Sequence, residues 1–501
     1  MAYRLEAFAD VGLDESLLGV LLGEHERGRV PVLRRLWLYY RNPEEIRAGI
    51  SGWDGRRRLA QEMGLPARLT GATRGDPALD DRETRRKEIV IENDIGWRIH
   101  AMVDFMFGKP IQVLSTARDE EQRKMIDRVL DAVWEASGGV GLLQDIALLG
   151  HVYGYVDVTV RADERGLGLL SGRSLDDVDF ETIAESIRIE PVEPTRGIPL
   201  LDPSDYRRIE AYVTVVERVL NMTTRENRRG RPGRRGASTQ ERTERRKSTR
   251  VEIMSGSAHQ VYEDGHLIED RTVGWTGGAV PVVHIQNQSQ PFRYEGLSEV
   301  EPLIALQDEL NTRLSDRASR VTLQSFKMYL AKGLDGFEKM PIGPGVVWST
   351  DNPDASIESF AGDGHSPSEE SHIEQVRESF DKVSAVPPLA SGVVRAKIGN
   401  LSSANALKIT LMGVLSKTAR KRVTYGRGIS QISRLVLSAL DATGVLATER
   451  VDRGVRIEWP DPLPVDAVDE ASAAKTKIEL GVPRERVLEE LGYAATDPGV
   501  Q

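Results

Sequence analysis

Residues Tyr294–Arg320 have the sequence YEGLSEVEPLIALQDELNTRLSDRASR, which carries two independent signals of a long helix. Ser298 and Glu301 form an S-x-x-E capping box, in which the hydroxyl and the carboxylate each accept a hydrogen bond from a free backbone N–H of the first turn. Apolar residues then recur every three or four positions, within one third of the helix circumference. They are Val300, Leu303, Leu306, Leu310, Leu314, Ala318 and Val321. The pattern predicts a helix over residues 297–325 that packs along one stripe.

A second helix with the same signals is predicted over residues 366–385. Ser366 and Glu369 repeat the capping box, and Pro367 occupies the first helical position, where its missing N–H costs nothing. The predicted packing stripe is Ile373, Val376, Phe380 and Val383. The opposite side, which is typically solvent-facing, carries Glu374, Glu378 and Asp381. Residues 326–365, between the two helices, have the mixed pattern of short strands and turns.

A segment without helical periodicity, VPPLASGVVRAKIGN, follows as residues 386–400. Beyond it, a serine cap begins a long apolar-periodic stretch over residues 401–442. Gly426 and Gly428 lie within this stretch, so a bend or break is expected there. The remaining predicted elements are a strand within 443–465 and two short helices within 466–501. A mobile loop between long helices is the feature that needs a functional explanation.

The first 296 residues mix helical and strand patterns. In residues 91–106, isoleucine and methionine recur at steps of three or four, which predicts a helix. In residues 156–160, valine alternates with Asp157 and Thr159, the pattern of a strand buried on one face. The Asp264–Gly265 pair marks a hairpin turn. We therefore expect an α/β region before the long helices.

The composition excludes several classes of protein. The chain has 501 residues, no cysteine, and no run near the roughly 20 apolar residues that cross a bilayer. We expect two to four sub-domains, no thiol chemistry and no membrane span. The N-terminus lacks the basic start and cleavage site of a signal peptide. The formal net charge is −10, yet residues 223–250 hold 11 Lys and Arg against 3 Asp and Glu, so the remainder carries −18.

The basic segment 223–250 has no periodicity and almost no apolar residues, so we expect a flexible insertion that joins two strands. Two interpretations stay open. The arginines neutralise phosphates of a nucleic acid, or they keep a surface loop extended and soluble. Single-strand binding is disfavoured because the segment has no aromatic residue for base stacking. The candidate phosphate contacts are Arg228, Arg229, Arg234 and Arg235.

No catalytic constellation is found. Neither glycine-rich phosphate motif occurs between a strand and a helix, and no G-x-S-x-G elbow is present. His365 and His372 flank two glutamates, but their spacing is not that of a helical metal site, and Glu369 is already expected to cap a helix. His151 is expected to be a packed or surface histidine. We therefore predict no enzyme, no cofactor and no metal.

The order of these elements, together with three local patterns, resembles the portal proteins of tailed bacteriophages of the long-tailed type. The patterns are NDIGWRIHAMVDFMFGKPIQV from Asn93, the segment from Tyr294 quoted above, and NLSSANALKITLMGVLSKTARKR from Asn400. The similarity spans about residues 35–490, by order more than by identity. The arginine-rich insertion and a short C-terminal region depart from the family pattern.

The resemblance implies an α+β portal-type fold whose copies, twelve in such portals, form a ring around a channel for double-stranded DNA. The implied parts are a wing (1–296), a stem helix (297–325), a clip (326–365), a second stem helix (366–385), a tunnel loop (386–400), a long bent wing helix (401–442), a wing strand (443–465) and a helical crown (466–501). The implied partners are the large terminase subunit, a head-tail adaptor, and the major capsid and scaffolding proteins. The implied location is the portal vertex of the virion, after assembly in the host cytoplasm.

The resemblance also implies roles for particular residues. The tunnel loop would present Val386, Leu389, Gly392, Arg395, Lys397 and Gly399 to DNA. The acidic stem residues Glu374, Glu378 and Asp381 would line the channel, where carboxylates repel DNA and prevent sticking. The stem stripes would pack against neighbouring copies through Leu303, Leu306, Leu310, Leu314, Ile373, Val376 and Phe380. Two alternatives remain: a nucleic-acid-binding protein that acts through residues 223–250, and a metal-dependent hydrolase that uses His365.

Overall fold

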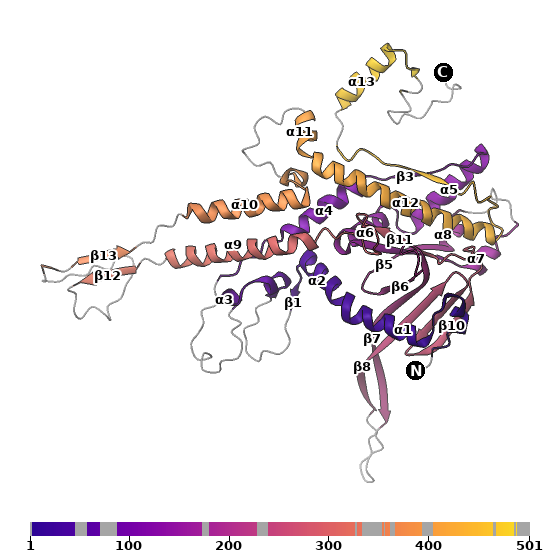
Figure 1. The fold of residues 1–501 in the computed structure, drawn as a ribbon, viewed down its shortest axis with the longest axis horizontal. Helices are drawn as coiled ribbons and strands as arrows, with labels where there is room; N and C mark the ends of the chain where they lie inside the picture. The colour runs from indigo at the N-terminus through magenta and orange to yellow at the C-terminus, as the bar shows by residue number, and fades with distance from the viewer. Residues whose placement is uncertain are drawn as a thin grey trace, which may run out of the picture.

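The computed structural model describes residues 3–45, 58–70, 88–172, 180–227, 239–325, 328–332, 353–354, 356–360, 366–392, 404–463, 467–484 and 487. Every strand pairing within these ranges is antiparallel. A mixed body of helices and sheets carries a projecting two-helix rod (Figure 1). Helices combined with antiparallel sheets confirm the predicted α+β class.

The helices are α1 (Glu15–Glu24), α2 (Val30–Arg41), α3 (Ala67–Thr70), α4 (Asp94–Phe107), α5 (Glu120–Ala136), α6 (Gly139–Tyr153), α7 (Glu164–Gly168), α8 (Phe180–Glu185), α9 (Ile304–Ser325), α10 (Pro367–Ser384), α11 (Ala404–Thr410), α12 (Met412–Ala442) and α13 (Ala467–Glu479). The strands are β1 (Glu44–Glu45), β2 (Arg58–Leu59), β3 (Gln112–Ser115), β4 (Tyr155–Ala162), β5 (Ile187–Val192), β6 (Gly197–Leu201), β7 (Ile209–Asn227), β8 (Thr239–Ser255), β9 (Ala258–Glu263), β10 (His266–Thr272), β11 (Val282–Gln286), β12 (Met328–Lys332), β13 (Ser356–Phe360) and β14 (Val455–Glu458). Short 3-10 turns include η5 (Glu301–Leu303) and η6 (Pro388–Ser391).

The body is built on the three-stranded sheet β11–β4–β5, which shares one apolar core with α4, α5, α6 and α12. Asp157 and Thr159 of β4 are buried together with the valines between them. The prediction of a strand buried on one face is therefore wrong, because β4 is covered on both faces. The Asp157 carboxylate accepts hydrogen bonds from the hydroxyls of Tyr212 and Tyr294 at 2.7 Å, and His284 Nδ1 lies at the same distance. These partners compensate the burial of its charge.

A five-stranded sheet in the order β10–β9–β8–β7–β6 flanks the body. Its β9–β10 hairpin confirms the predicted turn, because Asp264 and Gly265 have φ angles of 49° and 80°, as a two-residue turn with two left-handed positions requires. The predicted flexible insertion within 223–250 is wrong for the residues described: residues 223–227 and 239–250 continue β7 and β8 in unbroken register. Backbone pairing forms this ribbon without the apolar alternation on which the sequence prediction depended.

The two-helix rod consists of α9 and α10, which lie side by side, with β12 and β13 paired near its far end (Figure 1). The Ser298 hydroxyl accepts from the N–H groups of Val300 and Glu301 at 3.0 and 3.3 Å, so the predicted N-terminal cap of the first helix is present, ahead of η5. The second predicted capping box is wrong. The Ser366 side chain makes no capping hydrogen bond, and Glu369 instead pairs with Arg320 of α9, which draws the two helices together.

The long helix α12 is continuous through Gly426 and Gly428, so the helix does not break there. A β-carbon on Gly428 would lie 2.5 Å from the Ile285 side chain of β11, and one on Gly426 would contact Trp459. These glycines allow α12 to approach the sheet closely instead of breaking the helix. The interruption lies earlier, at Leu411 between α11 and α12.

Candidate functional site

The residues predicted for the tunnel loop do not share one environment. Val386 is fully buried, and Leu389 packs against the same apolar cluster, which includes Met102, Leu411 and Val414. Val386 therefore has no exposed surface in this chain, whereas Leu389 is partly exposed, and the contact of the loop with DNA stays a prediction. Gly392 ends η6 with a left-handed φ of 80°, which favours glycine. Arg395, Lys397 and Gly399 lie outside the described residues.

Arg98 of α4 holds the point where α10 turns into this segment. Its guanidinium is 1% exposed and donates to the carboxylate of Asp381 at 2.8 Å, to the hydroxyl of Ser384 at 3.3 Å and to the carbonyl of Val386. Asp94 supplies a second carboxylate at 3.5 Å. Asp381 is therefore the partner of a buried cation, with 25% of its own side chain exposed, and its place in a channel wall stays a prediction. Glu374 and Glu378 of the same helix are exposed.

A second buried ion cluster lies beside the first. Glu299 lies two residues before the start of η5 and is 3% exposed, and its carboxylate lies 2.5 Å from Lys417 Nζ and 2.7 Å from Lys421 Nζ. Lys417 also donates to the carbonyl of Ser384 at 2.8 Å. One carboxylate and two lysines of α12 thus connect the start of one rod helix, the end of the other and the long helix.

Burial and charge set the protonation of this cluster. Burial by itself raises the pKa of Glu299, but the charges of Lys421 and Lys417 outweigh it and hold that pKa well below its usual range. Burial lowers the pKa of Lys421 to about 8 despite the attraction of Glu299. Burial, followed by the charge of Lys421, also lowers the pKa of His151 well below its usual value, so this histidine is neutral at pH 7. His151 is fully buried, one of the two positions expected from the sequence.

The apolar stripes of α9 and α10 are buried inside one chain. With α2 and α4 they form a single cluster, in which Leu306 is partly buried and the other stripe residues are buried: Leu303, Leu310, Leu314, Ile373, Val376 and Phe380. Val321 and Val383, near the C-terminal ends of the two helices, remain exposed. The two stripes face each other and the base of the body, and their contact with neighbouring copies stays a prediction.

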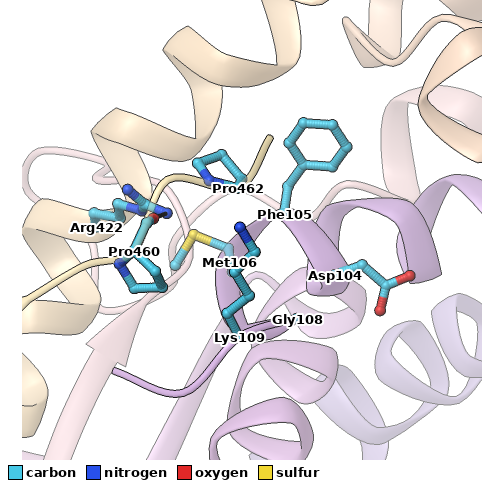
Figure 2. A pocket seen from close by; sticks show the side chains of 8 residues that line it. All are labelled: Asp104, Phe105, Met106, Gly108, Lys109, Arg422, Pro460 and Pro462. Atoms are coloured by element: carbon cyan, nitrogen blue, oxygen red, sulfur yellow. Dashed lines mark hydrogen bonds between the residues drawn. The ribbon is translucent and has the colours of Figure 1, made fainter. Parts of the chain in front are cut away.

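The described residues offer little for small-molecule chemistry. Figure 2 shows a cavity of about 130 Å³ between the end of α4 and residues 460–462, lined in part by Asp104, Lys109 and Arg422. Lys109 and Arg422 already donate to backbone carbonyls of Asp461 and Pro460. No group of three potential metal ligands occurs in the described ranges. His372 lies 2.9 Å from the Glu309 carboxylate, and His365 is outside the described residues.

Sequence reasoning missed the buried charges at this junction: Arg98, Glu299, Lys417 and Lys421. One signal was available for the lysines. Lys417 and Lys421 are spaced i, i+4 and lie in register with Val414 and Tyr425, on the face of α12 that packs against the body. A charge placed on a packing face predicts a buried partner, although the sequence does not identify which carboxylate supplies it.

Comparison with known proteins gives the chain a family. Three similar structures come from gene transfer agent particles. The neck of an empty particle (C6 symmetry) has 14% identity over 80% of this chain and 90% of its own, with a TM-score of 0.45. The neck of a native particle (C12 symmetry) has 12% identity over 80% and 89%, with a TM-score of 0.43. The native virion has 12% identity over 93% and 100%, with a TM-score of 0.40.

These TM-scores are low, so the assignment rests on sequence. No curated protein matches the chain. Among the described helices, none is long and apolar enough to span a membrane. The family described as "Phage portal protein, SPP1 Gp6-like" matches residues 98–494, a range that includes Arg98, the rod, both ion clusters and α12. The chain therefore belongs to the phage portal protein family.

Proposed function

We propose that copies of this chain close into a ring, of about twelve, that surrounds a channel for packaging and ejecting double-stranded DNA at one capsid vertex. The observation that carries this proposal is the family match over residues 98–494. The rod supports it, because two paired helices with a small β tip provide a projecting tube wall when repeated around an axis (Figure 1). A head-to-tail ring requires two different complementary surfaces on each chain.

The parts of the chain take the following roles in this proposal. The body up to residue 296 is the wing, α9 and α10 are the stem, and residues 326–365 are the clip, where the large terminase subunit and the head-tail adaptor dock. Residues 386–400 form the tunnel loop, residues 401–442 the long helix, 443–465 the wing strand and 466–501 the crown. The major capsid and scaffolding proteins contact the assembled ring. The protein itself is not an enzyme, and it assembles in the host cytoplasm before it becomes part of the virion.

Two carboxylates suit the channel wall. Glu374 and Glu378 are spaced i, i+4 on the exposed side of α10, opposite the buried stripe. Duplex DNA carries about one negative charge per ~1.7 Å, so an acidic wall repels it and favours sliding over binding. Arg395 and Lys397 would make transient phosphate contacts at the narrowest point. The Arg98 and Glu299 clusters would hold the base of that loop while DNA passes.

The first prediction concerns assembly. Twelve copies of the 55.5 kDa chain form a particle of about 670 kDa, which native mass measurement detects. Negative-stain microscopy of the same sample is expected to show rings with a central hole, and no ATP turnover should accompany them. A chain that stays monomeric under every assembly condition would contradict the proposal. Closed rings with Glu374 and Glu378 on the outer rim, seen by cryo-microscopy, would contradict the channel assignment alone.

A further inference from the structure

The β7–β8 pair leaves the sheet as a two-stranded ribbon. Pairing with β6 ends at Thr214, and pairing with β9 ends at Arg250. Beyond these positions, β7 and β8 pair only with each other in the described chain, from Glu217–Thr249 to Asn227–Thr239. Figure 1 shows the pair pointing away from the body, on the side opposite α12. At about 3.4 Å per residue, this basic ribbon (residues 216–227 and 239–250) is about 40 Å long.

The register of β7 and β8 groups basic residues on each face of the ribbon. Directly opposed residues share a face, and so do alternate residues along a strand. By this rule Arg218, Arg242, Arg246 and Arg250 occupy one face, against Glu226 and Glu244. Arg225, Arg245 and Lys247 belong to the other face, against Glu217 and Glu241. Both faces are net positive, and the arginine-rich residues 228–238 connect the strands.

Ser248 is buried at the base of the ribbon, and the side chains described next to it, from Glu217 to Val219 and at Lys247, are exposed. Lys247 is 77% exposed and lies 3.7 Å from Glu217, which is 68% exposed, an ion pair that contributes little in water. Val219 is also exposed. The attachment to the body is firm by contrast: Arg161 of β4 donates to both carboxylate oxygens of Glu252 at 2.5 and 2.8 Å. The ribbon is therefore anchored to the body at its base and extends from it as an arm.

We propose that the basic ribbon binds the phosphate backbone of duplex DNA outside the channel. The ribbon holds seven Lys and Arg against four Asp and Glu, a balance of +3, in a chain whose formal net charge is −10, so attraction for a polyanion is concentrated there. A two-stranded ribbon fits the major groove of B-DNA. The segment 223–250 has no aromatic residue, which favours duplex over single strands. This contact goes beyond the proposed function, because the ribbon does not depend on ring closure.

Covalently closed circular duplex is the probe that tests this contact, because a closed circle cannot thread a preformed ring. We expect the full chain to bind it with an affinity that falls steeply with salt. The variant Arg218→Gln/Arg242→Gln/Arg246→Gln should bind at least about tenfold more weakly, and the slope of log K against log salt should fall by about 2.7, since each phosphate contact contributes about 0.9. Fluorescence anisotropy with a labelled circle measures both quantities.

The matched control is Arg128→Gln/Arg165→Gln/Arg188→Gln, which removes the same charge from exposed arginines of α5, α7 and β5. It should retain the affinity and slope of the parent. Equal binding by both variants, or binding of linear duplex but not of circles, overturns the proposal. The proposal is also overturned if the ribbon variant keeps its binding to DNA and loses only its binding to an acidic protein surface. Particle mass is measured in parallel, so a failure to form rings is distinguished from a failure to bind DNA.

Discussion

Glu299→Gln is expected to lower the free energy of unfolding by about 3–5 kcal/mol, the cost of removing one partner from a buried ion cluster. The variant keeps the shape of the side chain but leaves Lys417 and Lys421, which are 9% and 1% exposed, without a countercharge. Burial lowers the pKa of Lys421 to about 8, so part of the Lys421 population is uncharged. This partial deprotonation keeps the loss of stability toward the lower figure of the range. Urea unfolding followed by tryptophan fluorescence measures the change.

The control for this variant is Glu301→Gln, which removes the same charge two residues away from an exposed position. It should change stability by less than about 0.5 kcal/mol. The pH dependence gives a second readout. The folded-state pKa of Glu299 is depressed, so its stabilisation is complete above the unfolded pKa of about 4.5 and is lost as pH falls below that value. The parent should therefore lose stability on acidification more steeply than Glu299→Gln. Parallel acid profiles would contradict the assignment.

Gly154→Ala is expected to destabilise the protein by about 3 kcal/mol or more. Gly154 ends α6 with a φ of 92°, where an L side chain is strained, and a β-carbon there would lie 2.4 Å from the carbonyl oxygen of Gly296. Because backbone cannot move aside as a flexible side chain does, the chain that leads into the rod would shift. Thermal unfolding and particle mass should both report the defect.

Gly141→Ala is the matched control in the same helix. Gly141 is exposed and lies in the first turn of α6, and a β-carbon added there would meet no atom within 4 Å. Alanine at this position should raise stability by up to about 1 kcal/mol, because it restricts the unfolded chain and favours the helix. Equal destabilisation by both substitutions would mean that the loss does not depend on the contact with Gly296, and would remove the special role of Gly154.

Local sequence patterns predicted those elements that depend on neighbouring residues alone. The stripes of α4, α9 and α10 and the turn of the β9–β10 hairpin were all available from the sequence, because amphipathic helices and two-residue turns are local patterns. The tip strands β12 and β13 agree with the short strands expected within 326–365. The order of these elements, more than any single motif, indicated the family.

The errors arose where tertiary context outweighs local pattern. Gly428 was expected to break the helix because glycine disfavours helical structure. Its missing β-carbon instead makes room for Ile285, a residue far away in the sequence. The ribbon of β7 and β8 is formed by backbone pairing that needs no apolar residues. Asp381 has the position of a solvent-facing acid on α10, yet Arg98 arrives from α4 to bind it. Long-range partners of this kind are not encoded in a window of neighbouring residues.

The uninterrupted course of α12 has a mechanical consequence. At 1.5 Å per residue, its 31 residues form a beam about 46 Å long. A deflection at Met412, next to the segment that follows α10, is carried along this beam to Ala442 on the far side of the body. The interruption at Leu411, between α11 and α12, lies at the N-terminal end of this beam. The long helix α12 is therefore a stiff rod that joins its N-terminal end, next to the segment after α10, to the far side of the body.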